Sequence, residues 1–150
     1  MSTLAIEGAS TTNGPITKYA RGVGGFLGLL GVLSLVPGVT TNYSGMGFYS
    51  SEAQLFGLFT TSIVAAAVYL TAGACCIAFS TSPRQGHKAV VLTGNLLIIV
   101  AIGGAGLVVN PSPPLPVNEA SNYFHLFLGI LLLLGSVRAK AMHVKQYGVF

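Results

Sequence analysis

Four apolar stretches dominate this chain, and every Lys and Arg residue stands near an end of one of them. The seven basic residues fall before the first stretch, between the second and third, and after the fourth: Lys18, Arg21, Arg84, Lys88, Arg138, Lys140 and Lys145. The two other connecting segments, Pro37–Gln54 and Asn110–Asn122, contain no Lys or Arg. Cytoplasmic loops of membrane proteins retain basic residues, whereas translocated loops lose them. The pattern therefore predicts a chain that crosses a membrane four times, with both termini in the cytoplasm.

The scarcity of charged residues indicates the same class of protein. Charged residues make up 7% of the chain, against about 25% in a soluble protein. Such a chain cannot cover a water-facing surface with polar groups, and its length has room for one domain. We interpret the net charge of +4 as basic residues that meet lipid headgroups, and we expect no nucleic-acid partner.

Breaks in the apolar pattern give the expected bounds of the elements. We expect an N-terminal tail over residues 1–17 and an all-α integral membrane domain over residues 18–147, folded as an antiparallel bundle of four transmembrane helices. The expected helices cover approximately residues 19–36, 52–79, 83–109 and 119–145. The segment Ser51–Gln54 has the form of a capping box and sets the start of the second helix. Ser82–Gln85 has the same form with Pro at the first helical position, which predicts a tight turn into the third helix.

Small and polar residues mark positions where helices can contact one another. Gly24 and Gly28 form a Gly-x-x-x-Gly pair, which lets another backbone approach closely. The partner of that pair is either a helix of the same bundle or a second subunit. Asn118 and Asn122 open the fourth helix as polar groups on one face. Helix packing or partner contact is expected at seven residues: Gly24, Gly28, Gly31, Gly103, Gly106, Asn118 and Asn122.

His125 is the candidate ligand-binding residue. It lies about two turns into the expected fourth helix, on the face of Asn118. A neutral imidazole there can hydrogen-bond Tyr69 or a loop carbonyl; the alternative is an axial ligand to a haem iron or a chlorophyll magnesium. His87 and His143 stand among basic residues, and we expect both to face solvent or lipid headgroups.

Glu52 and Glu119 stand at helix starts, and the apolar cores of the four expected helices contain no Asp, no Glu, no Lys and no Arg. Proton pumps, voltage sensors and most ion-coupled transporters depend on such groups inside the membrane. The chain also has no phosphate-binding glycine loop, no His-Glu-x-x-His sequence and no Ser/His/Asp set. We therefore expect no catalytic residues, no metal site and no enzymatic activity.

Two segments resemble a known family. Leu55–Phe59 and Leu115–Gly129, the second with the pattern Asn-x-x-x-Asn-x-x-His-Leu-x-x-Gly, are similar to small four-span bacterial membrane proteins catalogued as a domain of unknown function, the 4383 family. The resemblance covers approximately residues 22–137. The family repeats a His-containing pattern in helix two, where this chain has Ala65 and Tyr69. The resemblance implies an internal duplication of helix pairs, one-two and three-four.

Three functional hypotheses remain. The first is a non-catalytic accessory or scaffold subunit that packs against a larger energy-converting membrane complex, respiratory or photosynthetic. The second is a pigment- or haem-binding membrane subunit that uses His125. The third is a small-molecule or lipid channel or transporter, with Asn95, Tyr69 and His125 lining a wet cavity in a dimer. The expected partners are the lipid bilayer and a larger complex or a homo-oligomer, the expected bound molecules are lipids with chlorophyll or haem as alternatives, and the expected location is a bacterial plasma membrane or a thylakoid.

Overall fold

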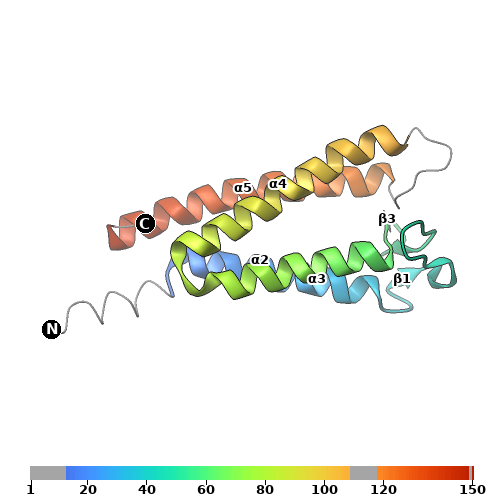
Figure 1. Ribbon diagram of the computed structural model, residues 1–150, viewed down its shortest axis with the longest axis horizontal. Coiled ribbons are helices and arrows are strands. Elements are labelled where there is room, and N and C mark those ends of the chain that lie inside the picture. The colour runs from blue at the N-terminus through green and yellow to red at the C-terminus, as the bar shows by residue number, and fades with distance from the viewer. Residues whose placement is uncertain (1–12, 109–117, 149) are drawn as a thin grey trace.

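The computed structural model describes residues 13–108, 118–148 and 150, and helices make up most of this part of the chain (Figure 1). The helices are α2 (Pro15–Ser34), α3 (Ile63–Ala78), α4 (Pro83–Val108) and α5 (Glu119–Tyr147). Three short strands lie between α2 and α3: β1 (Thr40–Thr41), β2 (Gln54–Leu55) and β3 (Phe59–Thr60). Two 3-10 turns complete the described elements, η1 (Tyr43–Gly45) and η2 (Phe79–Thr81).

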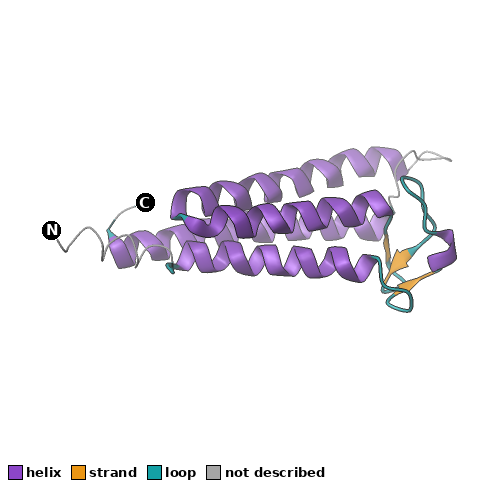
Figure 2. Ribbon diagram, turned by 60° about the horizontal axis from the view of Figure 1, so that its bottom comes forward, coloured by secondary structure: helices purple, strands orange, loops and turns teal. Residues whose placement is uncertain are grey.

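The two ends of the bundle differ in structure and in charge. The strands lie at one end, which we call the sheet end (Figure 2). They form an antiparallel sheet in the order β1-β2-β3. Leu55 pairs with Thr40 on one side and with Phe59 on the other. The opposite end, the basic end, is where α2 and α4 begin and α5 ends, and it holds all seven Lys and Arg residues (Figure 1). Glu52 and Glu119 lie toward the sheet end.

The first helix begins earlier than expected, at Pro15 rather than near residue 19. Proline suits the first helical turn because its missing N–H has no partner to lose there. Ile16 and Thr17 are fully buried, and the Thr17 hydroxyl donates to the Gly14 carbonyl over 2.8 Å. The last residues of the expected tail are therefore helical; its first twelve residues lie outside the part of the chain that the structure describes.

The prediction that the second helix starts near residue 52 is wrong. α3 starts at Ile63, and the hydroxyl of Ser62 caps it by accepting from the Ala65 N–H over 3.1 Å. The preceding residues form the β2–β3 hairpin instead. Its turn residues Phe56 and Gly57 are both left-handed, with φ of 55° and 69°, and the Leu58 N–H donates to the Leu55 carbonyl across them over 3.1 Å. A helix cannot pass through two left-handed residues, so this turn delays the helix start.

The helices pack as two close pairs, α2 with α3 and α4 with α5. Gly24 and Gly73 lie at the first crossing, where a Cβ on Gly73 would stand 2.7 Å from the Gly24 carbonyl oxygen. Gly94 and Gly129 lie at the second, where a Cβ on Gly129 would stand 2.7 Å from the Gly94 carbonyl oxygen. These are the helix pairs that the implied duplication joins.

The predicted tight turn between the second and third helices is present, and Ser82 caps the start of α4 by accepting from the Gln85 N–H over 3.3 Å. Contact between α3 and α4 is nevertheless minor beside the contact within each pair. α2 joins the pairs instead, since it packs against α3, α4 and α5. On α2, the Tyr19 hydroxyl reaches the carbonyl oxygens of Leu131 and Leu132 at 3.3 Å each.

Three helical segments of the described chain are long and apolar enough to cross a membrane. They are Ile63–Thr81, Pro83–Gly106 and Glu119–Tyr147, with mean hydropathy of 2.0, 2.1 and 1.6. α2 is richer in glycine and carries Lys18 and Arg21 near its start. The composition of the helices is that of a membrane protein.

Candidate functional site

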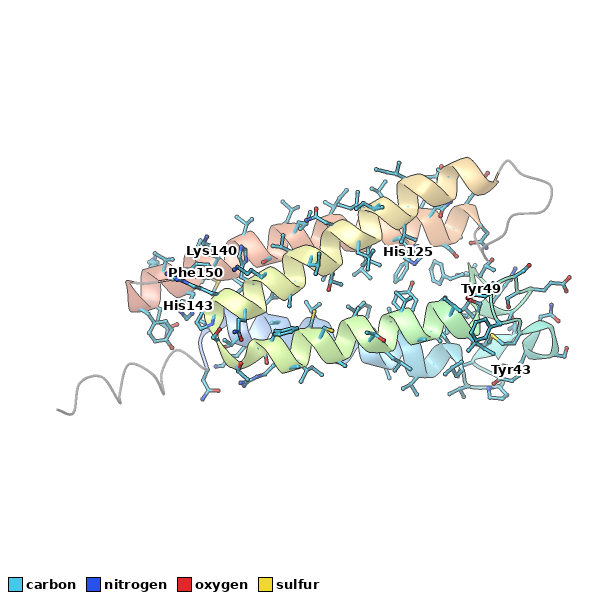
Figure 3. All side chains as sticks on the ribbon, viewed as in Figure 1. Tyr43, Tyr49, His125, Lys140, His143 and Phe150 are labelled. Carbon is cyan, nitrogen blue, oxygen red and sulfur yellow. The ribbon has the colours of Figure 1, made fainter. Side chains whose placement is uncertain are left out.

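His125 of α5 lies between the two helix pairs, in the half of the bundle nearer the sheet end (Figure 3). Tyr69 of α3 meets it there. The tyrosine oxygen lies 2.5 Å from the histidine Nε2, and the two ring centroids are 5.9 Å apart. This hydrogen bond is one of the two alternatives that the sequence left open for His125. It is the polar link between the α2–α3 pair and the α4–α5 pair at this level of the bundle.

The start of α5 is held against the β2–β3 hairpin, which fixes the position of His125. Asn118 caps α5 by accepting from the Ser121 N–H over 2.8 Å. Its Nδ2 donates to the Leu58 carbonyl over 2.9 Å, and the Ser121 hydroxyl donates to the Thr60 carbonyl over 3.4 Å. The expected contact at Asn118 is thus a contact within the chain, made to a hairpin that the sequence did not predict.

An apolar cavity of about 320 Å³ lies beside Tyr69, between α2, the hairpin and α5. Its walls are mainly aromatic and aliphatic, with hydroxyl groups in addition: Phe26, Leu29, Leu30, Leu33, Ser34, Leu55, Phe56, Phe59, Thr60, Thr61, Tyr69, Ser121 and Phe124. A second hollow, a groove of about 600 Å³, follows α2 and α5 toward Lys18. Phe26 and Phe124 line both spaces, so the cavity and the groove adjoin.

Three buried polar atoms in this half of the bundle have no hydrogen-bond partner among the described residues. They are Thr61 Oγ1, Asn122 Oδ1 and His125 Nδ1. Asn122, expected as a contact residue, lies against Gly104 of α4, where a Cβ would overlap its amide. Buried polar atoms of this kind are uncommon in folded proteins and call for an explanation.

The geometry around His125 does not suit a haem or chlorophyll ligand. Nε2 is engaged by the Tyr69 hydroxyl, and Nδ1 is enclosed by protein. A metal ion inside a macrocycle needs one of these nitrogens free and approachable. Within the described ranges, no three His, Cys, Asp or Glu side chains gather as a metal-binding group.

The glycines expected at contacts divide into packed and open ones. Gly24 and Gly31 lie against α3, where a Cβ would crowd the Gly73 carbonyl or Leu70. Gly28, Gly103 and Gly106 have open space where a Cβ would point. The backbone of Gly28 nevertheless lies against α3, because a Cβ on Gly73 would stand 2.7 Å from the Gly28 nitrogen. Asn95 of α4 is exposed and does not line the cavity beside Tyr69.

At the basic end, the structure corrects the expectation for one histidine. His143 is fully buried, because α5 continues to Tyr147 and the start of α2 covers the imidazole, which a Cβ on Gly14 would overlap. His87 is half-buried and its Nδ1 lies 2.7 Å from the Ser136 hydroxyl. No local pattern indicates this burial, since both histidines stand in basic segments.

Comparison with known proteins places the chain in a family. The family model described as Domain of unknown function (DUF4383) matches residues 18–137. Searches among curated proteins and among solved structures found no match. The matched range includes both close helix pairs over most of their length, the hairpin, Tyr69 and His125. The chain therefore belongs to the DUF4383 family.

Proposed function

We propose that this protein is a non-catalytic accessory or scaffold subunit that packs against a larger membrane complex through the outward face of α4. In this proposal the chain crosses the bilayer four times, with the basic end in the cytoplasm. The proposal rests on one observation above all, the position of Asn95.

Asn95 lies in the middle of α4 and its side chain is exposed. It makes no side-chain hydrogen bond to the described residues, and its neighbours on the exposed surface are apolar, with Leu92 72% and Ile99 65% exposed. An amide without a partner in hydrocarbon costs about 4–8 kcal/mol relative to water. Asn side chains in membranes serve as hydrogen-bonding groups between helices. A partner helix that supplies a hydrogen bond to Asn95 resolves this cost.

Glycines on the same helix favour a helical partner over lipid. Gly103 and Gly106 follow Asn95 along α4, and a Cβ on either would meet nothing within 4 Å. Small residues on a membrane helix allow a second backbone to approach closely. Gly22 and Gly25 of α2 have the same open surroundings, which provides a second surface of this kind.

The length of α2 and the charges of the basic end support four crossings. α2 has 20 residues and is therefore about 30 Å long, the thickness of a bilayer's hydrocarbon core. All seven cations gather at one end, which favours the cytoplasmic side for that end. That the larger complex is an energy-converting one stays a prediction. The proteins that co-purify with this chain would identify the complex.

The test replaces Asn95 by leucine in the natural host. We expect the wild-type protein, extracted in mild detergent, to migrate in a large assembly on native electrophoresis. Asn95→Leu removes one interhelical hydrogen bond, worth about 0.6–2 kcal/mol, and weakens association by about 3- to 30-fold. Thr71→Val is the matched control, because it removes a polar group from an exposed position of α3 that has no part in the proposal.

Two results contradict the proposal outright, and a third contradicts part of it. One is a wild-type protein that migrates as a solitary monomer at its native expression level. The other is equal loss of the assembly in Asn95→Leu and Thr71→Val, which indicates a general effect of losing a polar group. An assembly that contains only copies of this chain contradicts the larger complex while leaving α4 as an interface.

A further inference from the structure

We infer that the cavity beside Tyr69 is a binding site for a lipid-soluble quinone, a flat ring that carries carbonyl oxygens and a long apolar tail. This inference goes beyond the proposed role as a subunit and does not depend on it. Four observations carry it: the proton count of the Tyr69–His125 pair, the aromatic walls, the adjoining groove and the depth of the site.

The Tyr69–His125 pair has one more hydrogen-bond donor than it uses. A neutral imidazole has one N–H and tyrosine has one O–H, and the single bond between the two side chains consumes one of them. If the proton is on Nδ1, the surplus donor is enclosed with no partner in the described part of the chain. If the proton is on Nε2, that nitrogen donates to the tyrosine oxygen, and the tyrosine O–H is free.

When the proton is on Nε2, the free tyrosine O–H can donate to a molecule in the cavity, because Tyr69 lines it. Buried side-chain polar atoms without a hydrogen-bond partner are uncommon in folded proteins. A molecule in the cavity that presents a carbonyl oxygen satisfies the tyrosine O–H. Thr61 supplies a second hydroxyl, since it lines the same cavity and its oxygen is buried without a partner in the described ranges.

The walls of the cavity favour a flat ring over a branched or saturated molecule. Phenylalanine rings reach it from three directions, Phe26 from α2, Phe59 from the hairpin and Phe124 from α5. Phe59 and Phe124 are themselves in contact, with ring centroids 4.7 Å apart. Aromatic rings pack against one another in offset or edge-on arrangements, so these walls can hold a flat ring. The cavity volume of about 320 Å³ is at the small end of the range for ligand sites.

The groove along α2 and α5 gives an apolar tail a path out of the cavity. It begins at Phe26 and Phe124, which line both spaces, and continues past Val23 and Leu128. Its walls are almost entirely apolar apart from Lys18 and Tyr19 at the far end. A tailed ring therefore fills both spaces, with its carbonyl at Tyr69 and its tail along the groove.

Depth separates this ligand from a phospholipid. Tyr69 lies seven residues beyond the cap of α3 at Ser62, or about 10 Å along the helix. The ester carbonyls of phospholipids belong to the interfacial layer outside the hydrocarbon core. A carbonyl on a ring that dissolves in hydrocarbon reaches the level of Tyr69 without moving a charged headgroup below the interface.

The test measures binding to the full chain in lipid nanodiscs by equilibrium dialysis, with empty nanodiscs subtracted. The probe is 2-methyl-1,4-naphthoquinone with a two-unit isoprenyl tail, and its comparison compound is the naphthalene with the same substituents and no oxygens. We expect the quinone to bind the wild type about 3- to 10-fold more tightly than the naphthalene, the effect of one or two hydrogen bonds. Tyr69→Phe should remove most of that ratio, whereas Tyr123→Phe, on the exposed side of α5, should leave it unchanged.

The inference is overturned by three results. They are no binding above empty nanodiscs, equal binding of the two compounds to the wild type, and a ratio that is the same in Tyr69→Phe and Tyr123→Phe. If Tyr69→Phe does not fold, the comparison of the two compounds on the wild type still tests whether the cavity prefers a quinone. None of these outcomes bears on native electrophoresis of Asn95→Leu, so the two proposals fail separately.

Discussion

The distance between α4 and α5 is set by two residues without side chains, Gly94 and Gly129. Glycine in a helix interior costs about 0.5–1 kcal/mol relative to alanine, so its presence at a crossing calls for compensation. Here each glycine lies on the other's backbone: a Cβ on Gly129 would stand 2.7 Å from the Gly94 carbonyl oxygen and 2.7 Å from Ile98 Cγ1. Without a hydrophobic force between helices in lipid, this close backbone packing is the main source of association.

We therefore predict that Gly129→Ala destabilises the protein by about 1–3 kcal/mol, the usual cost of overpacking. Gly103→Ala is the matched control on the partner helix, because a Cβ there meets nothing within 4 Å, and it should stabilise by up to about 1 kcal/mol through helix propensity. Unfolding in mixed micelles with increasing dodecyl sulfate measures both. Equal effects of the two substitutions would show that the crossing is looser than this geometry.

At the scale of elements, the β2–β3 hairpin shows where local signals in the sequence stop being sufficient. Ser51–Gln54 has the residues of a capping box, yet the residue that caps α3 is Ser62. Two features decide between the two serines: the Phe56-Gly57 turn, and the pairing of β2 with β3 on one side and with β1 on the other. Residues 40–41 supply β1 from an earlier part of the chain. Phenylalanine rarely adopts a left-handed turn conformation, so the sequence did not predict the hairpin.

The turn leads to a prediction about strain. Phe56 holds φ at 55°, a region that costs most residues about 1–2 kcal/mol and that asparagine tolerates. We expect Phe56→Asn, which creates the preferred Asn-Gly turn, to raise the free energy of unfolding by about 0.5–1 kcal/mol. Leu58→Asn is the control, since it replaces a similarly exposed apolar side chain, 58% against 52%, outside the left-handed positions. A gain in Leu58→Asn as large as in Phe56→Asn would show that the gain comes from replacing an exposed apolar side chain and not from the backbone.

For the whole molecule, the sequence predicted the helical composition and the order of the apolar helices, but not the space between the two helix pairs. The apolar stretches predicted helices, and the hydrogen bond between His125 and Tyr69, one of the contacts expected for this histidine, is present. The cavity beside Tyr69 depends on how α2, the hairpin and α5 meet, which no local pattern encodes. The burial of His143 has the same origin, because α2 begins early enough to cover it.

The separation of charge along the bundle predicts an orientation that labelling can test. With four crossings and the basic end in the cytoplasm, the sheet end lies on the outer side of the membrane. Asn13 and Gln85 then both lie on the cytoplasmic side. In a variant that lacks Cys75 and Cys76, we expect Ser44→Cys to react with a membrane-impermeant maleimide in intact cells. Asn13→Cys and Gln85→Cys should react only after lysis. All three side chains are exposed in the structure, so a lack of reaction reports the membrane and not burial within the protein.

The pair Asn13→Cys and Ser44→Cys tests α2 in particular, since these two positions flank that helix. If α2 lies along the interface instead of crossing, both react from the same side. If the charges act in the opposite sense, Asn13→Cys and Gln85→Cys react in intact cells and Ser44→Cys does not.

Adding a Lys at the sheet end tests the role of charge directly. Ser50→Lys should raise the fraction of inverted or misinserted protein, because a basic residue in a short translocated segment opposes the orientation favoured by the seven natural basic residues.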